Sequence, residues 1–124
     1  MNIKLKQGVA TVIVGPQGSG KSALARELAK AYGPFAEIHD FELMSHFQSW
    51  MNEDIKTVVV EGFPAKSNLI ERLKDLISSP QIEVNKKGKR PIYMATPNFL
   101  FHTHDEYALA TCENDRRFTV IKLA

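Results

Sequence analysis

Short apolar runs alternate along this chain with segments whose apolar residues recur at helical spacing. Runs of the first kind predict strands at Val9–Val14, Phe35–Asp40, Thr57–Val60, Pro91–Thr96 and Arg117–Leu123. Amphipathic segments predict helices at Lys21–Tyr32, Phe41–Met51 and Ala65–Ser78. Strands that alternate with helices favour a three-layer α/β/α fold, in which helices cover both faces of a parallel five-stranded sheet.

Composition and charge narrow the class of protein only a little. The chain has 124 residues, which suits one domain over 1–124, and its net charge of +2 does not identify a partner. The single cysteine, Cys112, cannot form an internal disulfide, which fits a reducing, cytoplasmic setting. No run is long and apolar enough for a signal peptide or a transmembrane helix, so we expect no membrane partner.

The clearest chemical signal is a glycine-rich segment between the first predicted strand and the first predicted helix. It reads Gly15-Pro16-Gln17-Gly18-Ser19-Gly20-Lys21-Ser22. This matches the phosphate-binding pattern G-x-x-x-x-G-K-[ST] in its strand-loop-helix context. The glycines let the backbone curl so that N–H groups point at an anion, at the positive end of the helix dipole. We expect Lys21 to contact the β- and γ-phosphates of ATP, and the Ser22 hydroxyl to ligate Mg²⁺.

A carboxylate, Glu61, follows the strand Thr57–Val60 and precedes Gly62. In a fold of this kind we expect Glu61 to lie beside the strand that enters the glycine-rich loop. There it would orient a water molecule or help to hold Mg²⁺. The alternative interpretation is an ordinary strand-end carboxylate in a turn.

The strand Pro91–Thr96 runs into Pro97 and Asn98. Ligands of open α/β sheets bind outside the carboxyl ends of the strands, so Asn98 is a candidate to hydrogen-bond the attacking water or the γ-phosphate. Asparagine also suits turns after proline, which leaves a turn residue as the alternative.

Basic residues gather between the last predicted helix and that strand. Ile82 and Val84 alternate with polar residues, as in an arm of a hairpin, and Asn85-Lys86-Lys87-Gly88 has the residue preferences of a turn. The projecting tip would carry Lys86, Lys87, Lys89 and Arg90. Such a tip suits the phosphate backbone of a nucleic acid, and a solvated loop is the alternative.

An arginine pair, Asp115-Arg116-Arg117, precedes the last predicted strand. A guanidinium held near a neighbouring subunit's γ-phosphate would act as an arginine finger. Salt bridging at the surface is the commoner use of such a pair.

The order of these pieces resembles the ATPase core of the superfamily 3 helicases, AAA+ ATPases of small DNA and RNA viruses such as parvoviruses and circoviruses. The shared order is the glycine-rich loop, the strand VVVEG, a helix, a basic hairpin, a strand ending T-x-N, then D-R-R-F and a closing strand. It extends from Val9 to Leu123, and the stretch Leu73–Asn98 is similar in both order and spacing. The resemblance implies a sheet order of 5-1-4-3-2.

The resemblance also implies roles for residues. Lys21 and Ser22 would be Walker A residues, Glu61 the Walker B catalytic carboxylate and Asn98 the sensor. Lys86 or Lys87 would contact nucleic acid, and Arg116 would be a finger acting on a neighbouring subunit. The implied cofactors are ATP and Mg²⁺. The implied partners are single-stranded DNA or RNA, other replication proteins and further copies of the chain in a nucleotide-dependent, head-to-tail oligomer. Val60 stands where that family usually has a second acid.

Two alternatives from other classes remain open. The loop suits a small nucleotide kinase equally well, and Glu61-Gly62-Phe63-Pro64 is similar to the D-G-F-P of adenylate kinases. Against this, Ala65 stands where those enzymes have arginine, and no arginine-rich lid follows. The other alternative is a module that binds nucleotide with negligible turnover, which the single Walker B acid favours.

Overall fold

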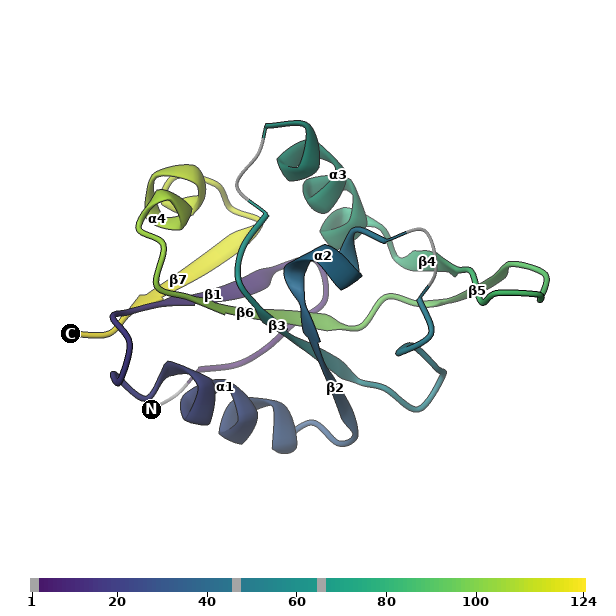
Figure 1. The fold of residues 1–124 in the computed structure, drawn as a ribbon, viewed down its shortest axis with the longest axis horizontal. Coiled ribbons are helices and arrows are strands. Elements are labelled where there is room, and N and C mark those ends of the chain that lie inside the picture. Colours follow the sequence, from purple (N-terminus) through teal and green to yellow (C-terminus); the bar gives the residue numbers. More distant parts are fainter. Residues whose placement is uncertain (1–2, 46–47, 65–66) are drawn as a thin grey trace.

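The computed structural model describes residues 3–45, 48–64 and 67–124, and its elements alternate between strands and helices (Figure 1). Their order and bounds are β1 Ala10–Val14, α1 Lys21–Lys30, β2 Phe35–His39, α2 Asp40–Leu43, β3 Thr57–Glu61, α3 Ser67–Ser78, β4 Gln81–Val84, β5 Ile92–Ala95, β6 Asn98–Thr103, α4 Tyr107–Cys112 and β7 Phe118–Lys122. Among the described helices, none has the length and apolar content needed to cross a membrane.

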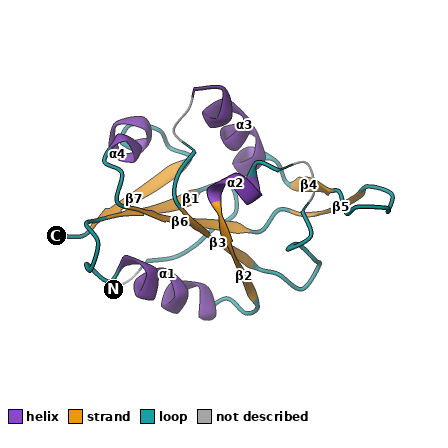
Figure 2. Cartoon of the chain, in the orientation of Figure 1, coloured by secondary structure: helices purple, strands orange, loops and turns teal. Residues whose placement is uncertain are grey.

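Five parallel strands form the central sheet, in the order β2-β3-β6-β1-β7. Helix α1 covers one face, and α2, α3 and α4 lie on the other (Figure 2). The predicted α/β fold with a five-stranded parallel sheet is therefore confirmed. Because all five strands point the same way, the loops that follow them meet along one edge of the sheet.

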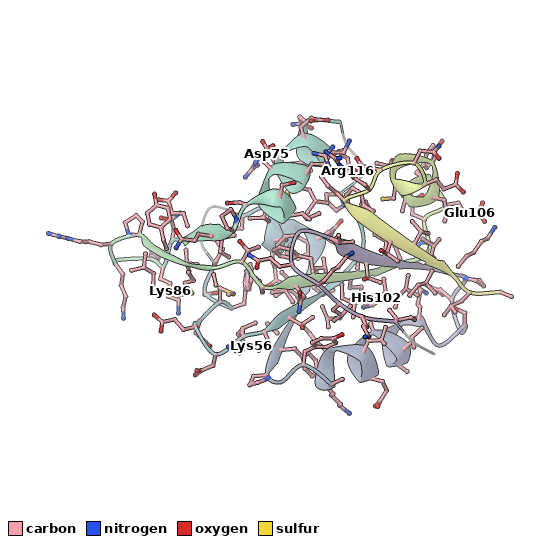
Figure 3. The ribbon with its side chains drawn as sticks, turned by 180° about the vertical axis from the view of Figure 1, so that it is seen from behind. Lys56, Asp75, Lys86, His102, Glu106 and Arg116 are labelled. Carbon is pink, nitrogen blue, oxygen red and sulfur yellow. The ribbon has the colours of Figure 1, made fainter. Side chains whose placement is uncertain are left out.

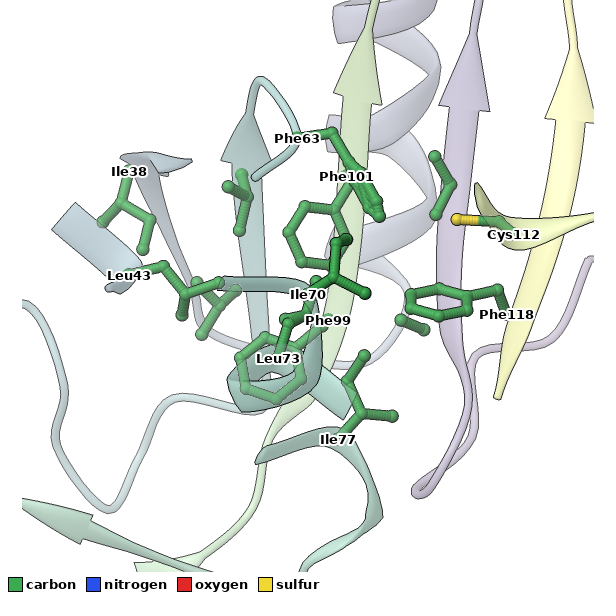
Figure 4. Close-up of a cluster of buried hydrophobic side chains, with 14 of the residues drawn as sticks. Ile38, Leu43, Phe63, Ile70, Leu73, Ile77, Phe99, Phe101, Cys112 and Phe118 are labelled. Atoms are coloured by element: carbon green, nitrogen blue, oxygen red, sulfur yellow. The ribbon is translucent and has the colours of Figure 1, made fainter. Parts of the chain in front are cut away.

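Each face of the sheet has its own apolar cluster. Alternate side chains of one strand face opposite ways, so Val58 and Val60 of β3 join the cluster under α3, while Val59 joins the cluster under α1. The larger cluster packs Leu73 and Ile77 of α3 against the sheet (Figure 4). Both clusters consist of buried hydrophobic side chains, and they pack the helices against the sheet.

The prediction of the fourth strand was wrong. β5 (Ile92–Ala95) lies within the predicted Pro91–Thr96, but it pairs antiparallel with β4 in a separate two-stranded sheet. β6 takes the central position between β3 and β1. If β6 is counted as strand four and β7 as strand five, the observed order reads 5-1-4-3-2 from the β7 edge. The order with Pro91–Thr96 as strand four is not observed.

Two predicted helices differ in extent. The helix predicted at Phe41–Met51 is only α2, a single turn, and residues 46–47 lie outside the described residues. The backbone of Gln48 bonds to Asn85 of the hairpin, since Gln48 N–H donates to Asn85 O at 2.8 Å. That bond replaces the one Gln48 would make within a helix. The helix predicted at Ala65–Ser78 is described from Ser67, and residues 65–66 lie outside the described part.

The predicted basic hairpin is present as β4 and β5. It projects from the end of the molecule opposite the loop of residues 15–22 (Figure 1). The turn is Lys86–Lys89, closed by Lys89 N–H donating to Lys86 O at 3.0 Å, with Gly88 at φ +78°. The turn is thus one residue later than predicted, because the left-handed glycine takes the third position rather than the fourth.

Candidate nucleotide-binding site

The loop of residues 15–22 connects the end of β1 to the start of α1, as the sequence predicts. Gly18 and Gly20 have φ angles of +80° and +85°, which other residues resist, and Gly20 is the N-cap of α1. The cap makes no side-chain hydrogen bond, and the first turn of α1 has no acidic residue. The positive end of this helix is therefore not neutralised from within its own first turn.

The backbone N–H groups of this loop are free to bind an anion. Within the part of the chain that the structure describes, the N–H groups of Gly18, Gly20, Lys21 and Ser22 have no hydrogen-bond partner. The loop is closed instead by Ser19 N–H, which donates to Pro16 O at 3.2 Å. A row of unpaired N–H groups at a helix N-terminus is the arrangement that holds phosphate in proteins.

Close packing fixes the shape of the loop. A Cβ added at Gly15 would lie 2.7 Å from Ser19 Oγ and 3.0 Å from Leu123 Cβ, so only glycine fits there. Ser19 Oγ is buried and has no hydrogen-bond partner among the described residues. Lys21 Nζ lies over the loop, 3.4 Å from Pro16 O. A contact that long is weak, and a phosphate oxygen would replace it readily.

A cavity of about 470 Å³ opens in front of the loop. Its walls are Gln17, Gly18, Lys21 and Ser22 from the loop, Glu61 and Gly62 after β3, and His102, Thr103 and His104 at the end of β6. The predicted loop residues and the predicted carboxylate thus face one space. Such a volume is within the usual range of small-molecule sites.

Glu61 does not lie beside β1, because β6 separates β3 from β1. Its carboxylate still reaches the cavity, since Glu61 shares the α1 face of β3 with Val59. Val60 points the other way and is fully buried in the larger apolar cluster. Position 60 therefore offers no second acid to the cavity.

A histidine holds the Glu61 carboxylate at the sheet edge. His39 ends β2 directly opposite Glu61, and His39 Nδ1 lies 3.2 Å from Glu61 Oε2. The His39 ring stacks on the Phe41 ring, with 5.4 Å between the ring centroids. The backbone N–H of His39 donates to Glu42 Oε1 at 3.0 Å. The His39 ring thus lies between Phe41 and the Glu61 carboxylate, and both His39 and Glu61 are more than half exposed.

A second polar cavity of about 240 Å³ adjoins the first and shares Ser22, Glu61 and His102 with it. Its other polar walls are Arg26 and Glu37, which form an ion pair at 2.6 Å, and His39. Space therefore continues beyond the carboxylate towards β2. The positive charge of Arg26 and the negative charge of Glu37 are both available there to a second reactant.

Sequence reasoning missed the residues at the end of β6. His102 is 8% exposed, and burial is the main cause that lowers its pKa, with nearby Glu61 opposing the shift. It is therefore held neutral in the wall of the cavity, able to donate or accept one hydrogen bond. The signal was available: Phe99-Leu100-Phe101 is a continuous apolar run of the kind typical of a central parallel strand.

Asn98 was placed wrongly. It begins β6 and pairs with Thr57, the first residue of β3, so it lies at the opposite end of the strands from the cavity. The cause is the misassigned strand: the carboxyl end that meets the cavity belongs to β6, whose last residue is Thr103. The position expected for a sensor is occupied instead by His102, Thr103 and His104.

Arg116 also lies away from the cavity of its own chain, since it precedes β7 whereas the 15–22 loop follows β1. Of the arginine pair, Arg117 is the salt-bridging member, with Nε and Nη2 each 3.1 Å from Asp115. Arg116 is exposed and makes no ion pair or hydrogen bond among the described residues. Figure 3 shows Arg116, His102 and Lys86 in three separate regions.

The predicted magnesium site is only partly built by side chains. In the described ranges, no three His, Cys, Asp or Glu side chains gather closely enough to hold a metal. Ser22 and Glu61 supply a hydroxyl and a carboxylate to one cavity, which are oxygen donors that Mg²⁺ accepts. This donor set fits a metal that is held together with a phosphate and water, rather than by the protein alone.

The fold and site define an α/β protein with a glycine-rich loop between β1 and α1. The chain belongs to the family of unknown function DUF5906, whose model matches residues 13–117. No curated protein matches it.

Solved structures similar to this chain are apo forms of the NrS-1 C-terminal region. One structure of residues 305–718 aligns over 94% of this chain at 25% identity with a TM-score of 0.73. An A-form structure aligns over 96% at 25% identity, with a TM-score of 0.67. The chain spans 30% of the length of each.

Proposed function

We propose that this chain binds ATP with Mg²⁺ and hydrolyses it, as the ATPase core of a replication factor of helicase type. The observation that carries the proposal is the cavity in which the free N–H groups of the 15–22 loop face Glu61. Phosphoryl transfer to water needs hydrogen-bond donors for the phosphate oxygens and a carboxylate near the attacking water, in the same cavity.

Each wall of the cavity has a task in this proposal. The loop N–H groups and Lys21 bind the phosphate oxygens, which places the γ-phosphate in front of Glu61. Ser22 would hold Mg²⁺, which when bound neutralises charge on the phosphates. Glu61 accepts a hydrogen bond from the attacking water and orients it for in-line attack. His102 and Thr103 border the same space and exclude bulk solvent from one side.

Single-stranded nucleic acid is the proposed partner. Four exposed or half-exposed basic residues at the hairpin tip, Lys86, Lys87, Lys89 and Arg90, supply a positive patch away from the ATP cavity. The resemblance to viral superfamily 3 helicases favours a replication role, with other replication proteins as partners. Arg116, which cannot reach its own cavity, suits a head-to-tail oligomer in which each chain completes its neighbour's site.

A small nucleotide kinase is the second candidate. The specific observation in its favour is the adjoining polar cavity, where Arg26 and His39 could hold an acceptor next to the γ-phosphate position. Hydrolysis remains the first candidate, because no arginine-rich lid segment follows in the sequence and a kinase needs cations to clamp the transferring phosphoryl group.

Phosphate release from ATP, measured with and without single-stranded DNA or RNA, tests the proposal. We expect slow basal release that the oligonucleotide stimulates. Transfer of phosphate to AMP or another acceptor would select the kinase instead. ATP binding with no turnover under either condition would leave a nucleotide-binding module and would overturn the proposed hydrolysis.

A further inference from the structure

We propose that the base of the hairpin contains a second ligand site, a pocket for one unstacked base of a single-stranded nucleic acid. The inference rests on the proposed function and deepens it, because it assigns the nucleic acid to named residues beyond the basic tip. The backbone of the strand would cross the tip, and the base would enter beside Tyr93.

A cavity of about 370 Å³ lies between β5 and the segment that leads into β3. Its apolar walls are Met51, Ile55 and Met94, and Tyr93 forms its rim. Glu53 and Lys56 add a hydrogen-bond acceptor and a donor. Apolar walls with a few polar groups suit a flat heterocycle that has two faces to bury and a polar edge to pair.

The exposure of the Tyr93 side chain is the observation that indicates a ligand. It is 69% exposed, although it lies within a strand and lines a cavity. Its neighbour Met94 is buried, whereas Ile92 on the other side is also exposed, at 45%. An exposed aromatic ring on a strand is a stacking platform for a base, and stacking tolerates any base because each has a π-face.

The charges around Tyr93 set the direction of the strand. Glu83 lies directly opposite Tyr93 in the β4–β5 pair and would repel a phosphate there. Arg90 and Lys89 lie on the tip side of Tyr93, so the phosphates would bind at the tip and the base would reach back to the ring. Lys86 lies on the hairpin, and Lys56 lies near the start of β3 (Figure 3).

The tip is held in place before any ligand binds. Asn85 N–H donates to Gln48 Oε1 at 2.9 Å, and Gln48 N–H donates to Asn85 O at 2.8 Å. This pair of bonds ties the hairpin to the segment that forms the other wall of the cavity. Little ordering entropy is lost when a strand binds to such a preformed surface.

Only a single strand fits this arrangement, because a base in a duplex is stacked on its neighbours and paired on its edge. Entry into the pocket requires a base that is already free, or the energy to unstack one. The pocket therefore favours single-stranded DNA or RNA over duplex, whereas the basic tip alone would bind either.

Fluorescence anisotropy with labelled oligo(dT) and oligo(U), each also made with abasic sites, tests the pocket on the full chain. We expect Tyr93→Ala to weaken binding by about five- to a hundredfold with little change in salt dependence. Replacing Lys86 and Lys87 by Ala should instead reduce the salt dependence. Tyr93→Phe should bind like the parent, since the ring is kept. The two oligonucleotides show whether the sugar matters.

Abasic sites make the test specific for bases. They should weaken binding by the parent to the level of Tyr93→Ala, and should not weaken Tyr93→Ala further. Tyr107→Ala is the matched control, because Tyr107 is 76% exposed but lies on α4. Equal binding by the parent and Tyr93→Ala, with salt-sensitive affinity intact, would overturn the pocket and leave the proposed function standing. No binding by the parent would overturn both, and a change in self-association alone would make Tyr93 a protein interface.

Discussion

At the scale of single residues, Glu61 and His39 are joined across two neighbouring strands. The alternation of β3 buries Val58 and Val60 and turns Glu61 towards α1, so its carboxylate reaches the cavity in front of the 15–22 loop. His39 Nδ1 lies 3.2 Å from this carboxylate. In the proposed function, Glu61 is the group that orients the attacking water.

Glu61→Gln should keep ATP binding and lower turnover by about a hundredfold or more, because an amide is a far weaker proton acceptor than a carboxylate. Steady-state phosphate release measures the turnover, and calorimetric titration measures the binding. Glu71→Gln is the control, since Glu71 is an exposed carboxylate on α3. Parent-like hydrolysis by Glu61→Gln would make Glu61 structural.

Asp115 predicts a pH-dependent contribution to stability. The Arg117 side chain donates hydrogen bonds to the Asp115 carboxylate, and this is the main cause that lowers the pKa of the Asp115 carboxyl below the ordinary 3.8. Hydrogen bonds from the Arg117 backbone N–H and from Lys74 lower this pKa further. A lowered carboxyl pKa stabilises the fold above the unfolded-state value, and the stabilisation is lost as the pH falls through 3.8 towards the folded-state value. Asp115→Asn should cost about 1–3 kcal/mol at neutral pH.

Urea unfolding at neutral pH and near pH 3 measures this contribution. The parent should lose more of its unfolding free energy on acidification than Asp115→Asn does. Asp54→Asn serves as the control, because the Asp54 side chain makes no ion pair among the described residues. An equal loss in Asp115→Asn and the parent would show that Asp115 is not the group responsible.

At the scale of elements, the 15–22 loop is coupled to the end of β7. Leu123 N–H donates to Val14 O at 2.8 Å, and Leu123 Cβ fills the space where Gly15 would carry a side chain. Leu123 therefore helps to hold the loop in its observed shape.

Gly15→Ala should cost about 1–3 kcal/mol of stability and weaken ATP binding, because its methyl group would overlap Ser19 Oγ and Leu123 Cβ. Urea unfolding and calorimetry measure the two effects. Adding Ser19→Ala should restore part of the stability, since it removes the 2.7 Å contact but leaves Leu123 in place. If Gly15→Ala alone is as stable as the parent, the loop accommodates a side chain at this position.

The elements also show why some of the fold could be predicted and some could not. Every residue of Val9–Val14 and Thr57–Val60 except Ala10 is β-branched, and short runs of this composition favour a buried strand. Pro91–Thr96 and the following Phe99–Phe101 both suit strands. Pro97 separates them and lacks the N–H that a central ladder requires, so the sheet strand begins after it.

The local sequence pattern was also insufficient to predict the structure of the segment after β2. The apolar stripe at helical spacing in Phe41–Met51 indicates that these residues are buried, not that they form a helix. Met51, for example, is 1% exposed although it lies in a loop. The bond partners that decided the outcome, Gln48 and Asn85, are distant in the chain. For the site, the local loop motif predicted the conformation of residues 15–22, whereas the role of His102 depended on which strand was central.

At the scale of the whole molecule, three chemical features lie far apart: the cavity in front of the 15–22 loop, Arg116 and the basic hairpin (Figure 3). One chain cannot bring Arg116 to its own cavity, so an arginine finger requires a second copy. A cavity of about 750 Å³ borders Arg116 and leaves its guanidinium accessible.

Activity per subunit should rise with protein concentration, and Arg116→Ala should lose that rise while it still binds ATP. Mixing Arg116→Ala with Glu61→Gln should recover activity well above either variant alone, because one mixed interface pairs an intact carboxylate with an intact finger. Arg72→Ala, an exposed arginine on α3 with no proposed role in either site, serves as the arginine control. Activity independent of concentration, with no loss in Arg116→Ala, would leave a self-contained monomer.

The central claim is that the 15–22 loop binds a nucleoside triphosphate, and calorimetric titration of the whole chain with ATP and Mg²⁺ tests it most directly. The account predicts one saturable site in the parent and in Lys30→Ala, a lysine at the far end of α1. It predicts that Lys21→Ala abolishes or severely weakens that binding, because the phosphates lose their ammonium partner. Unchanged affinity in Lys21→Ala, or no binding by the parent, would contradict it.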